Sequence, residues 1–189
     1  MKTISETCFS RYPKSLLRAD PVGSLAPYAR STNDIFLFAG ELLSEIPRYR
    51  LLLEDTVGKD LKSWKLYFPT AQDCEFLINR NFDDLIDHLN GDGYSTAVYV
   101  ADAEEKMVCY SNNRDSFSFC LTNCRVDPEL IERWDSDFAE HLKMVGVGFG
   151  TEGRQYIASI LEGLAKDDPA FKRRCTRILS GLNPFDSGR

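Results

Sequence analysis

The sequence predicts an α+β fold: a single domain in which a short antiparallel β-meander packs with several amphipathic helices. Three strand-like runs separated by turn residues, at 94–100, 105–111 and 116–122, predict the meander. Apolar residues at helical spacing before and after these runs predict the helices. A chain of 189 residues with 43% hydrophobic residues can bury a core of ordinary size without metal or disulfide support.

The N-terminal part divides into a leader and several expected elements. Residues 1–30 contain three prolines and are predicted to be an irregular leader, followed by the domain over 31–189. Helical spacing and capping residues predict four helices, and aromatic alternation predicts one strand. The helices are expected at 31–46, 47–57, 70–79 and 81–90, and the strand at 62–68.

The meander has two faces of different character. A tight turn over Asn112–Asp115 would place Val108 opposite Phe119 and Tyr110 opposite Phe117, and this face is expected to form core. The reverse face is small and weakly polar, so a helix layer or a partner is expected to cover it. Its members are Met107, Cys109, Ser118, Cys120 and Thr122.

The C-terminal part is predicted to be helical. Asp127-Pro128 and Asp168-Pro169 each combine a capping residue with proline in the first turn, which is a helix start signal. Between these starts, the glycine-rich stretch 146–153 is expected to connect one helix to the next.

Charge is distributed unevenly along the chain. The formal net charge is −6, but residues 70–140 carry sixteen Asp and Glu against five Lys and Arg. Such a field repels nucleic acid and attracts a basic protein. We therefore expect a basic protein partner and no nucleic-acid binding. The candidate partner-binding carboxylates are Asp102, Glu104, Glu105, Glu129, Glu132, Asp135, Asp137 and Glu140.

A second candidate site lies in the glycine-rich stretch. Gly148, Gly150 and Gly153 match the pattern G-x-G-x-x-G ahead of a helical segment, and Arg154 follows. In a loop, these glycines would let backbone amides approach a phosphate at a helix N-terminus. The stretch lacks the strands of a dinucleotide-binding unit, so a plain connector is the favoured interpretation.

Other motifs have simpler structural explanations. Asp83, Asp84, Asp87 and His88 share a helix face that fits a solvated acidic surface better than a metal site. Cys120 and Cys124 supply at most two zinc ligands. No motif for nucleophilic, phosphate-loop or metalloprotease chemistry occurs, so we expect no cofactor, no metal and no catalytic residues.

The compartment is inferred from what the chain contains. The N-terminus has no apolar signal region, and no apolar run approaches the ~18 residues needed to span a membrane. Six scattered cysteines suit reduced thiols. These features predict a cytoplasmic protein that does not bind membranes.

The leading functional hypothesis is an acidic intracellular inhibitor of the immunity-protein or antitoxin kind, an analogy of physical class only. It would occlude the active site of a basic toxin or enzyme, with carboxylates imitating substrate phosphates and the meander supplying an apolar anchor. The alternative is a small transferase-type enzyme that binds an anionic nucleotide-like cosubstrate at Gly148–Gly153. A third possibility is a subunit of a larger assembly. Strand order, oligomeric state and the partner's identity stay open.

Overall fold

The computed structural model describes residues 9–12, 16–18, 25–30, 32–39, 46–59, 61–91, 97–111 and 117–181. The chain forms two compact units. The first unit contains residues 1–20 and 31–126, and the second contains residues 21–30 and 127–189. The predicted α+β fold is confirmed, since the first unit holds a six-stranded antiparallel sheet and both units hold helices.

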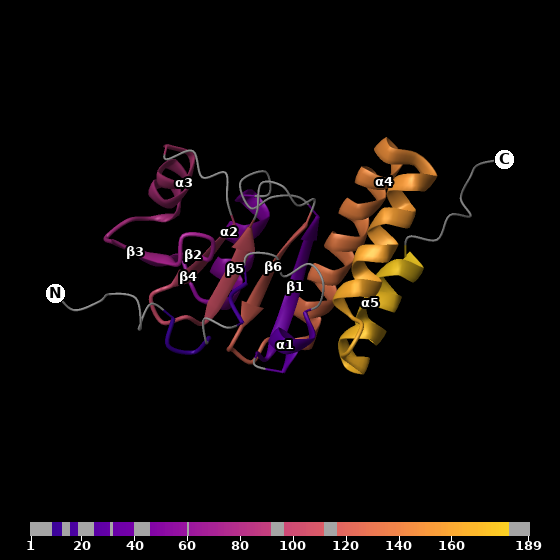
Figure 1. Cartoon of the computed structure of the whole chain (residues 1–189), viewed down its shortest axis with the longest axis horizontal. Coiled ribbons are helices and arrows are strands. Elements are labelled where there is room, and N and C mark those ends of the chain that lie inside the picture. Colours follow the sequence, from indigo (N-terminus) through magenta and orange to yellow (C-terminus); the bar gives the residue numbers. More distant parts are fainter. Residues whose placement is uncertain are drawn as a thin grey trace. The chain divides into compact units, whose positions relative to one another are not determined.

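The sheet of the first unit has the strand order β1-β6-β5-β4-β2-β3, with every neighbouring pair antiparallel (Figure 1). The three predicted meander strands are β4, β5 and β6, and the predicted strand at 62–68 is β2. β1 and β3 extend this core to the two edges. The strands are β1 (Asp34–Ala39), β2 (Ser63–Phe68), β3 (Asp73–Ile78), β4 (Val98–Asp102), β5 (Met107–Ser111) and β6 (Phe117–Thr122).

Aromatic residues cross one face of the sheet. Tyr67, Tyr99, Tyr110 and Phe119 come from β2, β4, β5 and β6, and neighbouring rings lie 5.0–6.4 Å apart. Phe9 packs edge-on against Tyr67 with ring centroids 6.3 Å apart. The row is buried, so it forms the centre of the core on this face.

Helices α2 (Ile46–Thr56) and α3 (Phe82–Gly91) belong to the same unit and were both predicted. The face of α3 expected to be apolar is buried, and it packs through Phe82 against Trp64 at 5.8 Å. Arg50 of α2 lies 5.0 Å over the Phe82 ring and pairs with Asp83, which connects the two helices. Gly58 follows the end of α2, and its φ of +110° suits glycine best.

The second unit is helical. It contains α1 (Ala26–Ala29), α4 (Pro128–Leu164) and α5 (Pro169–Gly181), and α4 and α5 lie side by side (Figure 1). Both predicted start signals are confirmed. Asp127 accepts a hydrogen bond from the Glu129 amide at 2.9 Å. Asp168 accepts hydrogen bonds from the amides of Ala170 and Phe171 in α5 at 2.9 and 2.8 Å.

Two predicted helices are strands. The segment expected to be helical at 31–46 forms β1, whose residues Ile35–Phe38 are all buried. An apolar run buried on both faces shows no alternation, and here its spacing also matched a helix. The segment at 70–79 forms β3, which is bounded by Gln72 and Asn79 in the left-handed region, at φ 55° and 56°.

The meander register differs from the expectation by two residues. Val108 pairs with Leu121 and Tyr110 with Phe119, instead of with Phe119 and Phe117. The expected tight turn over 112–115 lies outside the described residues. Because side chains alternate with a period of two, the shift leaves each residue on its predicted face. Both faces of β5 are buried, as predicted for the aromatic one.

The prediction that residues 146–153 connect two helices was wrong. α4 is one helix of 37 residues, and Gly146, Gly148, Gly150 and Gly153 lie inside it. Each glycine costs a helix about 1 kcal/mol relative to alanine, which is why the sequence indicated a break.

Candidate functional site

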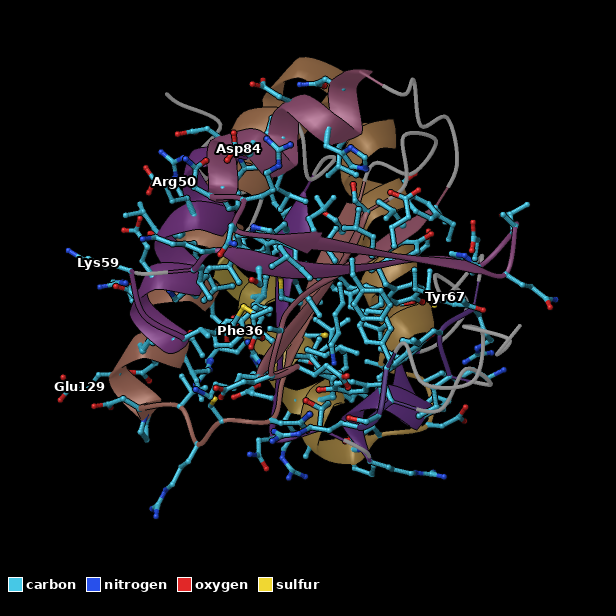
Figure 2. The ribbon with its side chains drawn as sticks, turned by 90° about the vertical axis from the view of Figure 1, so that its left-hand side faces the viewer. Phe36, Arg50, Lys59, Tyr67, Asp84 and Glu129 are labelled. Atoms are coloured by element: carbon cyan, nitrogen blue, oxygen red, sulfur yellow. A yellow bond between two sulfur atoms is a disulfide. The ribbon has the colours of Figure 1, made fainter. Side chains whose placement is uncertain are left out.

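The candidate site of the second unit is an acidic row on α4. Glu129, Glu132 and Glu140 are exposed, together with Ser136 between them. At 100° per residue these positions fall within a sector of about 80°, and the row is about 16 Å long. Figure 2 shows Glu129 pointing away from the ribbon. The structure thus places three predicted carboxylates on one accessible helix face.

Asp135 and Asp137 differ from this row. Asp135 is only 6% exposed, so it is not one of the accessible carboxylates that the sequence predicted. Its two carboxylate oxygens accept bonds from Arg174 Nε at 2.9 and 2.8 Å, and Arg177 Nη2 donates to one of them at 3.1 Å. This carboxylate therefore fixes α5 to α4 and is not available to a partner. Asp137 is half-buried.

A shallow groove of about 480 Å³ runs beside the acidic row. Arg177 lies 3.7 Å from Glu132 in a loose, solvent-exposed pair, so Glu132 keeps most of its exposure. The groove combines carboxylates, two arginines and small side chains. Its lining residues are Glu129, Glu132, Arg133, Asp135, Ser136, Ala139, Arg177 and Ile178.

The acidic cluster predicted at the β4–β5 turn is mostly internal. Asp102 is 2% exposed and accepts bonds from the amides of Glu104 and Met107 at 3.0 and 2.9 Å. Glu105 is fully buried. Only Glu104 is exposed, and it pairs with Lys106 at 2.7 Å. The expectation that all three carboxylates face a partner was wrong, because Asp102 bonds within the turn and Glu105 bonds to other parts of the first unit.

Glu105 clamps the N-terminal segment to the sheet. It accepts bonds from the amides of Ser10 and Arg11 at 2.9 and 2.8 Å, and from Lys65 Nζ at 2.6 Å. Burial raises the pKa of Glu105, but the bonds from Lys65, Arg11 and Ser10 outweigh it and hold the pKa below its usual value. The carboxylate is therefore ionised at neutral pH and serves a structural purpose.

A second groove, of about 470 Å³, lies in the first unit and was not predicted. Lys59, Lys62 and Lys106 line it along with Asp102 and Glu104. Figure 2 shows Lys59 projecting outward. The lysines are separated in sequence and come together only because the end of α2 lies beside the β4–β5 turn, so no local spacing signals them.

The apolar anchor expected on the meander is not accessible, since the described residues of β5 and β6 are buried on both faces. Among the described residues, the exposed large apolar side chains are Leu51, Phe76 and Ile78. Phe76 and Ile78 are alternate residues of the edge strand β3, so they share a face.

The acidic face of α3 participates in local contacts. Asp83 pairs with Arg50, and Asp84 forms a reciprocal capping arrangement with Asn81 at 2.9–3.0 Å. His88 Nε2 lies 2.7 Å from Glu75 Oε2 of β3. Within the described ranges, no group of three or more His, Cys, Asp or Glu side chains is arranged to hold a metal ion.

The glycine-rich candidate does not have the geometry that its chemistry requires. A phosphate-binding loop needs free amides at a helix N-terminus, but Gly148, Gly150, Gly153 and Arg154 are in the interior of α4. Amides in a helix interior are bonded to carbonyls four residues earlier. The loop on which this candidate depended is absent from the described helix.

The cysteines only partly match the expectation of reduced thiols. Cys109 and Cys120, opposite each other on β5 and β6, form a disulfide, so the expectation was wrong for this pair. Burial raises the pKa of Cys175 to about 12, with the nearby Arg174 lowering it only in part. Cys175 is therefore a thiol at neutral pH and a poor nucleophile.

No helix formed by the described residues has the length and apolar character that crossing a membrane requires. Comparisons with protein-family models, with curated proteins and with solved structures found no match to this chain.

Proposed function

We propose that the protein is an acidic protein-binding inhibitor that docks a basic partner on the α4 row, in the manner of immunity proteins and antitoxins. The observation that carries the proposal is the exposed alignment of Glu129, Glu132 and Glu140 on one helix face. Three carboxylates spaced over about 16 Å match a surface that binds a phosphate backbone or another polyanion. Occupying that surface would block a basic enzyme's active site.

The local structure supports a preorganised row. The Asp127 cap fixes the first turn of α4, and the buried Asp135–Arg174 pair anchors the same helix to α5 on the flank beside the row. A rigid row loses less conformational entropy on binding than a flexible acidic tail. Carboxylates placed in this way speed association and select a cationic partner.

The test compares two variants with the same net charge. E129Q/E132Q/E140Q removes the row, and the control variant D87N/E162Q/D167N removes three exposed carboxylates elsewhere. Both change the net charge from −6 to −3. A difference between them therefore reports the location of the charge and not its amount.

Wild type and both variants are immobilised, and native lysate is applied at low salt. A basic protein retained by wild type and control, but lost by the row variant, is then purified and assayed. The proposal requires that equimolar wild type suppress that protein's own activity. Equal retention by the two variants, or retention without inhibition, contradicts it.

The proposal includes a cytoplasmic location, for which the sequence is the support. The Cys109–Cys120 disulfide counts against a reducing compartment. Cell fractionation with thiol trapping at lysis decides whether the protein is in the cytoplasm or in an oxidising compartment. Recovery of the native protein in the cytoplasmic fraction is the required result.

A further inference from the structure

The edge strand β3 has the features of a binding site for an extended chain. It is the last strand of the sheet and pairs only with β2 among the described elements. Its six residues span about 20 Å, and positive-φ residues at Gln72 and Asn79 end it sharply on both sides. An edge strand offers unpaired backbone groups to an incoming strand unless it is blocked by proline, lysine or a bulge. β3 has no proline or lysine.

The two faces of β3 have different chemistry. Phe76 and Ile78 are 46% and 70% exposed on one face, where their β2 neighbours are Lys65 and Ser63. The other face carries Asp73 and Glu75, followed by the half-buried Leu77 at its end. An adjacent strand would therefore meet apolar side chains on one face and carboxylates on the other.

Helix α3 lies against the second face, because its His88 pairs with Glu75. A strand added at this edge is thus favoured by basic side chains directed toward Asp73 and Glu75.

We propose that β3 binds an extended segment of a partner protein as a seventh strand, and that this segment alternates apolar residues with lysine or arginine. The backbone would supply affinity, and the alternation would supply specificity. Apolar side chains would cover Phe76 and Ile78, while basic ones would lie across from Asp73 and Glu75.

A second copy of this chain fits the edge less well. Antiparallel self-pairing centred on Phe76 would bring two copies of Asp73 and Glu75 into one short ribbon, between molecules of net charge −6. A six-residue strand with two exposed apolar side chains also buries far less than the ~1,200 Å² of a stable interface. A short extended peptide can bind through backbone hydrogen bonds along the edge, so it does not need an interface of that area.

This inference is independent of the α4 row, because it uses other residues in the other unit. The test uses a fluorescein-labelled peptide of alternating valine and lysine. One control peptide has the same composition with the lysines in a block, and the other has glutamate in place of lysine. Binding is measured by fluorescence anisotropy at moderate salt, and amide exchange of β3 is followed with and without peptide.

The protein variants are I78T and D73N, which keep strand propensity and change exposed side chains. L51Q on α2 is the matched control, since Leu51 is also an exposed apolar residue, at 54%. We expect about fivefold weaker binding for I78T and for D73N, and unchanged binding for L51Q. Protection of β3 amides should rise with peptide.

Three results would overturn the proposal. The first is no binding of the alternating peptide at millimolar concentration. The second is equal binding of the block or glutamate peptide, which would show unspecific attraction. The third is self-association in sedimentation equilibrium that I78T abolishes, which would assign the edge to a second copy.

Discussion

Replacing Glu105 with glutamine tests the clamp between the N-terminal segment and the sheet. One carboxylate oxygen accepts from Lys65 and Ser10, and the other accepts from the Arg11 amide. Glutamine offers one oxygen, so its amide nitrogen must face a donor on one side. The lost charge-assisted bonds and the donors left unsatisfied give an expected destabilisation of about 3 kcal/mol. For a chain of this size that is a fall in Tm of about 6–12 °C.

The pH dependence of the same variant gives a second readout. Because the pKa of Glu105 is lowered in the folded protein, its stabilising contribution is complete above the unfolded value of about 4.3. The contribution is lost as the pH falls through the lower, folded pKa. The stability difference between wild type and E105Q should therefore be full at pH 7 and should shrink below about pH 4.

The assay combines urea denaturation at several pH values with amide hydrogen exchange. The amides of Ser10 and Arg11 should exchange faster in E105Q, since the clamp accepts bonds from both. E104Q is the control, because the neighbouring Glu104 is exposed and should matter little. A stability within about 0.5 kcal/mol of wild type at pH 7, with unchanged exchange at both amides, would refute the reasoning.

Two further outcomes follow from buried groups in the second unit. In D135A the free energy of unfolding should fall by about 3 kcal/mol, because Arg174 and Arg177 would lose their shared acceptor and the Arg174 side chain is only 12% exposed. Urea denaturation measures this change, and a loss below about 1 kcal/mol would contradict the expectation. In native protein treated with iodoacetamide at pH 8, the half-buried Cys74 should be labelled well before Cys175, because burial raises the pKa of Cys175 to about 12. Peptide mass spectrometry measures the order of labelling, and equal rates at the two cysteines would contradict the expectation.

Sequence reasoning succeeded where one local signal dominated. α3 has a one-sided apolar face and a capping pair, and α4 and α5 start at an Asp-Pro step, so all three could be predicted. It failed at β1, where a short apolar run is compatible with either period and only its place beside β6 decides. It also failed at 70–79, where left-handed Gln72 and Asn79 exclude a helix.

The candidate site was only partly predictable. The spacing of Glu129, Glu132 and Glu140 fixes a common helix face, so their exposure followed from the sequence. The burial of Asp135 depends on Arg174, 39 residues later, and that of Glu105 depends on Lys65, 40 residues earlier. A reading of the local sequence assigns such carboxylates to the surface, because charged residues are mostly exposed and a partner far away in the chain gives no local signal.

The strand order determines when each strand can find its neighbour while the chain is being synthesised. β2 to β6 pair with strands nearby in the chain, but among the described strands the neighbour of β1 is β6, and Ile35 meets Leu121 86 residues later. At 5–20 residues per second, the ribosome adds those residues in about 4–17 s. Throughout that interval the strand that pairs with the apolar segment Ile35–Phe38 in the folded protein has not been completed. The nascent chain therefore exposes an apolar segment, which favours association with other chains until β6 has been made.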